Sequence, residues 1–87
     1  MQEQTMFRKV FVSVLVQHGN DGKKVPISIT FEDGKKYDVD RLIERRRAAA
    51  SKVGGTGIRY TIRIGDHQTF LFEDEDMWFV EARNLHT

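Results

Sequence analysis

Residues 57–82 read GIRYTIRIGDHQTFLFEDEDMWFVEA, and this stretch decides the fold class. Its first segment alternates without a break, with an apolar residue at every second position from 58 to 64 and Arg59, Thr61 and Arg63 between them. A period of two is typical of a β-strand, because successive side chains point to opposite faces. The segment therefore predicts a strand whose apolar face lies in the core and whose other face carries arginine.

Two short polar turns divide the rest of this stretch into further strands. A Gly-Asp pair at 65–66 suits a two-residue hairpin turn, and the strand after it places Phe70 and Phe72 on one face. The acidic segment 73–76 then predicts a turn before a last strand at 77–82. The C-terminal part of the chain is thus expected to be three antiparallel strands.

Residues 8–17, RKVFVSVLVQ, predict a strand that is apolar on both faces. Four valines occupy one face, and Phe11 and Leu15 lie on the other. Valine and aromatic residues favour strands, because they pack well on a pleated surface. A second apolar face predicts either that another element covers it or that it is a partner surface.

Residues 25–32 predict the next strand, which begins close to Pro26, a residue that belongs at a strand start or an edge. The expected inward residues are Ile27, Ile29 and Phe31, and the expected outward residues are Ser28, Thr30 and Glu32. Asp33-Gly34 predicts a tight type I′ turn. It would lead into a strand that begins at 35.

Residues 40–52, DRLIERRRAAASK, fit two interpretations. As a helix, the segment has Asp40 as an N-cap and an alanine triplet of high helix propensity. As a strand, it simply continues the hairpin arm. We expect a strand over 36–45 followed by one helical turn over 46–51, before the glycine-rich segment 54–57.

The expected fold is all-β, with a short helical turn as the one exception. Five or six strands would form an antiparallel meander that curls into a small SH3-like barrel, because closure removes exposed sheet edges. With 87 residues the chain is expected to be one domain, ordered over 6–83, with tails at 1–5 and 84–87.

Composition excludes several functional classes. The chain has no cysteine, so disulfides, thiolate metal sites and a cysteine nucleophile are absent. A net charge of +1 argues against a strongly basic, nonspecific nucleic-acid binder. The N-terminus lacks a secretory pattern, and no apolar run approaches the roughly 20 residues of a membrane-spanning helix. We expect a soluble cytoplasmic protein that makes no membrane contact.

The arginines are the first candidate for a functional surface. If the strands near 36–45 and 57–64 are neighbours, their guanidinium groups line one surface, and a planar guanidinium suits phosphate. The residues expected to bind nucleic acid are Arg45, Arg46, Arg47, Arg59 and Arg63, with Arg41 beside them. The alternative is a solvated polar face that Asp38, Asp40 and Glu44 neutralise.

An aromatic residue in the last strand is the second candidate. Trp78 alternates with Phe79, so one of the two is expected in the core and the other at the surface. If Phe79 is in the core, Trp78 is an exposed anchor that can stack on a base. If Trp78 is in the core, the anchor is Phe79 or Met77.

The remaining polar groups favour ordinary surface roles. The glycine-rich segment 54–57 lacks the spacing of a phosphate-binding loop. The paired carboxylates Asp38/Asp40 and Asp74/Asp76 lack further ligands for a cation. The histidines and serines show no nucleophile–base pattern; they are His18, His67, His86, Ser13, Ser28 and Ser51. We expect no catalytic residue, metal site or cofactor, and so no enzyme.

The order of residues in 31–82 resembles a family of small bacterial β-domains of unknown function. The resemblance is carried by Phe31, Asp33-Gly34-Lys35 and Tyr37 on the hairpin, by Arg59-Tyr60-Thr61, and by Trp78-Phe79-Val80. Some members of that family are encoded near error-prone repair polymerases. The resemblance implies a small β module and assigns no binding or catalytic residues.

Together these features predict a non-enzymatic binding module. Its partner is expected to be DNA or RNA, held through the arginine face. The alternative is a protein partner or a second copy of the chain, held through the two-sided apolar strand 10–16 or through opposite charges.

Overall fold

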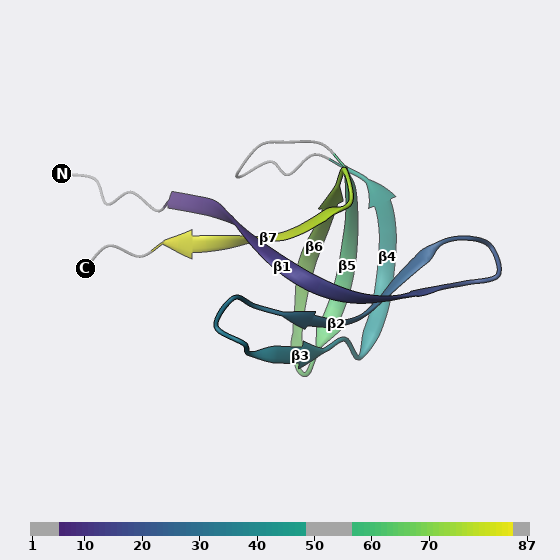
Figure 1. Ribbon diagram of the computed structural model, residues 1–87, viewed down its shortest axis with the longest axis horizontal. Helices are drawn as coiled ribbons and strands as arrows, with labels where there is room; N and C mark the ends of the chain where they lie inside the picture. Colours follow the sequence, from purple (N-terminus) through teal and green to yellow (C-terminus); the bar gives the residue numbers. More distant parts are fainter. Residues whose placement is uncertain (1–5, 49–56, 85–87) are drawn as a thin grey trace.

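The computed structural model describes residues 6–48 and 57–84, and every regular element in them is a β-strand (Figure 1). The strands are β1 Met6–His18, β2 Lys24–Thr30, β3 Lys36–Asp38, β4 Arg41–Arg47, β5 Ile58–Ile64, β6 His67–Asp74 and β7 Met77–Asn84. They form one antiparallel sheet in the order β3-β2-β1-β7-β6-β5-β4. The all-β class is confirmed, as a curled half-barrel of seven strands.

The sheet has more strands than expected, because the segment predicted as one strand over 36–45 divides into β3 and β4. The backbone N–H of Val39 donates to the carbonyl of Ile27 on β2 over 2.8 Å. The next N–H, of Asp40, donates to the carbonyl of Arg63 on β5 over 2.9 Å. The chain therefore leaves one end of the sheet and joins the other within two residues.

The helical turn expected over 46–51 is wrong for Arg46 and Arg47, which lie in β4. The N–H of Ala48 still donates to the carbonyl of Gly57 over 3.0 Å, so the pairing with β5 extends one residue beyond the strand. Pairing with a neighbouring strand overrides the high helix propensity of these arginines, because tertiary context outweighs intrinsic propensity. Residues 49–51 lie outside the described residues.

The long strand β1 makes the sheet curl. Residues 6–12 of β1 pair with β7, and residues 13–18 pair with β2. Figure 1 shows β1 passing across the β4–β7 half of the sheet. The two halves enclose a core of Ile29, Tyr60, Ile62 and Leu71, against which Val12, Val14, Trp78 and Val80 pack. The predicted inward face of 58–64 is confirmed.

Two β-bulges change which side chains face this core. On β2, Pro26 lies opposite Val16 and Ser28 lies opposite Leu15, so Ile27 is an extra residue. An extra residue shifts the alternation by one. Pro26 is therefore fully buried on the same side as Ile29. Ser28 lies opposite the exposed Leu15, on the side where it was expected, but it is buried there. The second bulge lies in β4, between Leu42 and Glu44.

The turn at Asp33-Gly34 also differs from the expected type I′ turn, which needs two positive φ angles. Gly34 has a φ of 87°, whereas Asp33 is not among the residues with positive φ. The N–H of Gly34 donates to the carbonyl of Phe31 over 2.9 Å, and the Asp33 carboxylate accepts the N–H of Lys35 over 2.9 Å. This is a type I turn closed by a left-handed glycine.

In residues 6–48 and 57–84, no helix has the length and apolar character needed to cross a bilayer.

Candidate nucleic-acid interface on the outer face

Five side chains line up across the outer face of the sheet, the face opposite the core. In register from β1 to β4 they are Phe11, Phe79, Phe72, Arg59 and Arg46. Each comes from a different strand, and each alternates with an inward neighbour, so the strand periodicity places all five on one side. We call these five residues the outer row.

The aromatic part of the outer row is a continuous stack. The rings of Phe72 and Phe79 are parallel within 11°, with centroids 5.2 Å apart. Phe11 contacts Phe79 edge-on at 6.0 Å between ring centroids, and Phe70, two residues before Phe72 on the same face of β6, contacts Phe72 at 6.5 Å. Phe72 and Phe79 are buried, whereas Phe11 is 45% exposed and Phe70 is 40% exposed. Two buried rings thus support two accessible ones.

Cations lie directly on these rings. The guanidinium of Arg59 is 4.5 Å from the centroid of Phe70, and the ammonium of Lys9 is 4.7 Å from the centroid of Phe79. Both distances are typical of cation–π contacts. A guanidinium nitrogen of Arg59 also lies 3.7 Å from a carboxylate oxygen of Glu44. The buried Nε of Arg59 has no hydrogen-bond acceptor among the described residues.

The predicted arginine face is brought together only in part. Strands β4 and β5 are neighbours, as expected, and Arg46, Arg59 and Arg63 lie on the outer face. Arg45 and Arg47 instead lie opposite Tyr60 and Ile58, whose side chains point to the core side. Three consecutive residues of a strand cannot share a face.

The bulge in β4 brings one more arginine to the outer face. Because of the extra residue Ile43, Arg41 and Glu44 both lie on the same side as Arg46. Arg41 lies opposite Arg63, which is exposed and whose Nε donates to the carbonyl of Gly65 over 3.0 Å. The outer face therefore carries basic groups along much of the β4–β5 pair.

Trp78 does not lie on the outer face. Its ring is half-buried on the core side, 5.0 Å from the ring of Tyr60. Phe79 is buried in the outer row, and within residues 77–82 of this strand Met77 is exposed, at 53%. Of the two alternatives left open by the sequence, the structure therefore has the one with Trp78 on the core side.

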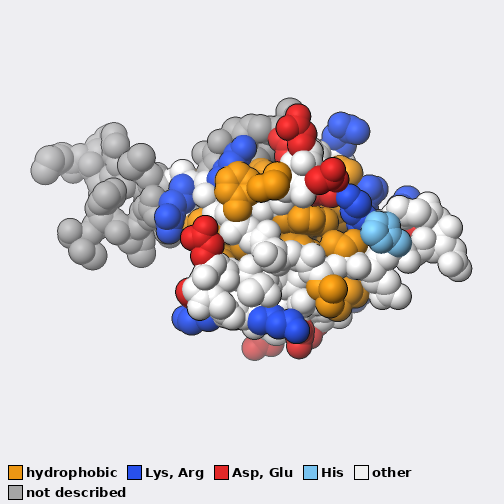
Figure 2. Space-filling model, viewed as in Figure 1, with side chains coloured by type: hydrophobic (Ala, Val, Ile, Leu, Met, Phe, Trp, Pro, Cys, Tyr) orange, Lys and Arg blue, Asp and Glu red, His pale blue; other side chains and the backbone are white. Residues whose placement is uncertain are grey.

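Among the described residues of the outer face, the accessible rings are those of Phe11 and Phe70, neither of which was expected as a stacking residue. A signal for both was present. Phe11 alternates with core valines, and Phe70 shares a face with Phe72, opposite Leu71. Figure 2 shows hydrophobic side chains (orange) at the surface beside basic (blue) and acidic (red) groups.

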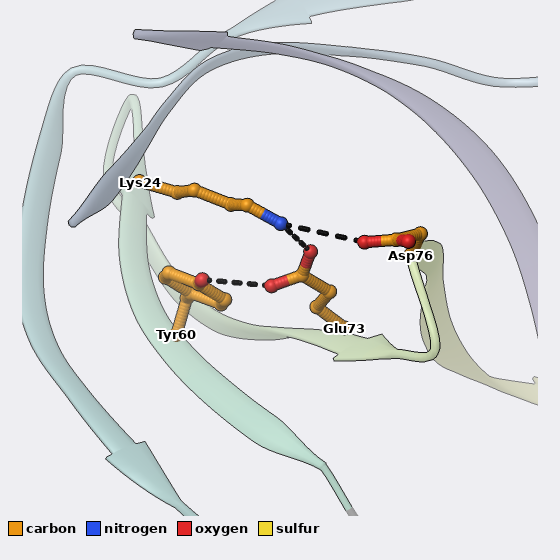
Figure 3. Close-up of polar contacts among 4 residues, drawn as sticks. All are labelled: Lys24, Tyr60, Glu73 and Asp76. Atoms are coloured by element: carbon orange, nitrogen blue, oxygen red, sulfur yellow. Dashed lines mark hydrogen bonds and ion pairs between the residues drawn. The ribbon is translucent and has the colours of Figure 1, made fainter. Parts of the chain in front are cut away.

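A separate polar cluster lies on the core side at one end of the half-barrel (Figure 3). The Glu73 carboxylate is 7% exposed and accepts hydrogen bonds from the Tyr60 hydroxyl, over 3.1 Å, and from the Lys24 ammonium. Lys24 also lies 3.6 Å from a carboxylate oxygen of Asp76. Burial raises the pKa of Tyr60, and the hydrogen bond to Glu73 raises the pKa of Lys24. The cluster joins β2 to the β6–β7 hairpin. Its ion pairs and hydrogen bonds give Lys24, Tyr60 and Glu73 a structural role.

The remaining predicted candidates are placed as follows. Asp40 accepts the N–H of Gly65 over 2.6 Å, which is a structural role. Within residues 6–48 and 57–84, no group of three or more metal-ligating side chains is found. His67 lies with Phe31 and Tyr37 around a surface hollow of about 340 Å³, and His18 is exposed. Residues 54–56, Ser51 and His86 lie outside the described residues.

Comparisons with known proteins add no family to this geometry. No family model, no curated protein and no solved structure matches the chain. The resemblance to small bacterial β-domains therefore stays a prediction.

Proposed function

We propose that the protein binds single-stranded nucleic acid across the outer row. The observation that carries this proposal is the register itself, which sets accessible phenylalanine rings and arginines side by side on one face. Small β-barrels bind single strands by this combination of stacking and backbone charge. The SH3-like barrel and the cytoplasmic location expected from the sequence are part of the proposal.

Each part of the surface has a distinct chemical role in this proposal. Phe11 and Phe70 present exposed rings on which bases stack, and stacking contributes about 1–3 kcal/mol per base. Arg46 and Arg63 are exposed and bind phosphate oxygens. Adjacent strands lie about 4.8 Å apart, so the outer row spans about 19 Å from Phe11 to Arg46.

The local charge supports the proposal even though the whole chain is nearly neutral. The outer face of β4 to β7 and of the β1 segment that pairs with β7 carries the basic residues Lys9, Arg41, Arg46, Arg59 and Arg63, and the acidic residues Glu44, Asp74 and Glu81. The surplus is positive, and the carboxylates moderate it. Binding should therefore be salt-sensitive and of moderate affinity.

The direct test is a titration of the protein with labelled single-stranded and duplex oligonucleotides at 50 and 200 mM salt. We expect single strands to bind more tightly than duplexes, because only unpaired bases can stack on the exposed rings. Neutralising about three phosphates predicts a slope of log K against log salt of about −2. Absence of single-strand binding at 50 mM salt contradicts the proposal.

Stacking is tested by replacing Phe70 with leucine, which keeps an apolar side chain but removes the ring. Loss of about 1 kcal/mol of stacking should weaken binding of single strands about fivefold. The matched control is Tyr37→Leu, since Tyr37 has nearly the same exposure, 41% against 40%, but faces the hollow beside Phe31. Equal losses in the two variants argue against base stacking at Phe70.

A second candidate function is protein binding or homodimerisation through the outer face of β1. On β1, Phe11 and Leu15 are 45% and 60% exposed, and Met77 on the neighbouring strand β7 is 53% exposed, so the second apolar face of β1 is only partly covered by the described residues. Light scattering at high protein concentration tests the dimer. A monomer under those conditions removes the homodimer and leaves only a different protein as the partner.

A further inference from the structure

The outer edge of β4 is a second surface, separate from the face on which the outer row lies. The sheet order ends at β4, which pairs only with β5 in the described part of the chain. In an antiparallel pair, the backbone groups of alternate residues point toward and away from the neighbour. The N–H of Ala48 bonds to Gly57, so Arg46 and Glu44 also face β5. The N–H and C=O groups of Arg45 and Arg47 therefore face outward along the free edge.

From Glu44 to Arg47, three of the four side chains along this edge are arginines. Arg46 points to the outer face, whereas Arg45 and Arg47 point to the core side and are exposed. The one carboxylate of the strand, Glu44, lies 3.7 Å from Arg59 on β5. In a strand added beside β4, the Cβ atoms directly opposite these arginines would lie about 4.5–5.5 Å from the arginine Cβ atoms, on both faces of the sheet.

This charge decides which strand the edge can accept. Pairing with β4 of a second copy would set arginine against arginine, and like charges directly opposite each other are destabilising. The other end of the sheet is β3, which has only 3 residues and offers a shorter edge. The edge of β4 therefore disfavours a second copy and favours an extended segment that carries carboxylates.

We propose that the free edge of β4 binds an extended acidic segment of a protein partner as an additional strand. Main-chain hydrogen bonds to Arg45 and Arg47 supply the strand pairing, and the arginine side chains select for Asp and Glu. The bulge at Ile43 interrupts the edge, so the regular docking stretch begins at Glu44. This interaction is separate from nucleic-acid binding, because its backbone groups and two of its arginines lie off the outer row.

The first test uses the unmodified protein and an eight-residue peptide of alternating Glu and Val. A second peptide has the same sequence with every amide N-methylated, so it keeps the charge but cannot donate strand hydrogen bonds. Each hydrogen bond contributes about 1 kcal/mol, so the methylated peptide should bind at least tenfold more weakly. Equal affinities would show that only charge is recognised and would overturn the proposal.

The second test compares Arg45→Thr with Arg45→Pro. Both variants lose the same charge, but proline also removes the outward N–H, which the sheet does not use. We expect Arg45→Pro to bind the Glu-Val peptide at least threefold more weakly than Arg45→Thr. Equal binding by two folded variants would overturn the proposal.

Amide hydrogen exchange of the unmodified protein supplies the readout that needs no variant. The peptide should slow exchange at the N–H groups of Arg45 and Arg47. Slowing of the same two groups by a single-stranded oligonucleotide, but not by the peptide, would assign the edge to nucleic acid and overturn the proposal.

Discussion

At the scale of single residues, Glu73 shows how the half-barrel holds a buried charge. The position is on the core side of β6, opposite Trp78, and the carboxylate is nearly inaccessible. A buried carboxylate is costly unless its oxygens are hydrogen-bonded. The hydroxyl of Tyr60 and the ammonium of Lys24 supply those bonds from two other strands.

Replacing Glu73 with glutamine should therefore lower the free energy of unfolding by about 1–3 kcal/mol, since charge-assisted hydrogen bonds contribute that much. Chemical denaturation measures the change. The control is Asp76→Asn, because Asp76 is 93% exposed and its contact with Lys24 is long, at 3.6 Å. Similar losses in both variants would contradict the assigned roles.

The same cluster predicts a loss of stability in alkali. Burial raises the pKa of Tyr60, and the hydrogen bond to Glu73 raises the pKa of Lys24. Groups whose pKa is higher in the folded state hold their protons more tightly there, so their contribution is complete below about pH 10 and is lost as the pH rises further.

The unfolding free energy, measured at pH 8 and pH 11, should therefore fall between these values. The fall should be smaller in Tyr60→Phe, which cannot ionise at this position but retains Lys24. An identical fall in the variant and the unmodified protein would exclude Tyr60 as a source.

The sequence predicted the outer residues of β5 correctly and left open which of Trp78 and Phe79 lies on the core side. Arg59 and Arg63 followed from strict alternation. The side on which Trp78 lies did not follow from alternation, because both faces of β7 are apolar and alternation alone does not say which face is inside. Only the stacking of Phe79 on Phe72, from a neighbouring strand, shows that the second face is also filled.

At the scale of the strands, the close approach of Gly57 to β6 is a strict requirement. A Cβ atom at Gly57 would lie 2.2 Å from the carbonyl oxygen of Glu73, and backbone cannot move away as a side chain can. We expect Gly57→Ala to destabilise the fold by about 1–3 kcal/mol in chemical denaturation.

The control for Gly57 is Gly19→Ala, because the one close contact of a Cβ at Gly19 would be a side-chain oxygen of Asp21 at 2.9 Å, whereas the nearest backbone atom, the carbonyl oxygen of Lys23, lies at an ordinary contact distance of 3.7 Å. This variant should change stability much less. A larger loss for Gly19→Ala than for Gly57→Ala would show that the contact with β6 is not tight.

The strands themselves were predictable, and the bulges in β2 and β4 were not. Hydrophobic alternation reveals a strand from local sequence. A bulge depends on the register against a partner that lies elsewhere in the chain, such as Leu15 and Val16 opposite β2. This dependence explains why the burial of Pro26 and the position of Arg41 on the same side as Arg46 could not be read from local sequence.

At the scale of the whole molecule, pairing between the first and last described strands determines the surface. Phe11 on β1 joins Phe79 on β7 only because these strands are neighbours, although they are far apart in sequence. A sequence-based meander predicts neighbours that follow one another and cannot supply this pairing. Alternation thus indicated the outward side chains of single strands, such as Arg59 and Arg63, but not which aromatic rings the pairing of β1 with β7 brings together.

The central claim, that the outer face binds single-stranded nucleic acid, is tested most directly by two adjacent arginines. Arg46 and Arg45 follow each other on β4, so Arg46→Gln and Arg45→Gln remove the same charge from opposite faces. The measurement is the affinity for a labelled single-stranded oligonucleotide between 50 and 200 mM salt. We expect Arg46→Gln to bind several-fold more weakly, with a salt slope shallower by about 0.7, and Arg45→Gln to bind like the unmodified protein. Equal weakening in both variants, or a larger effect at Arg45, would contradict the account.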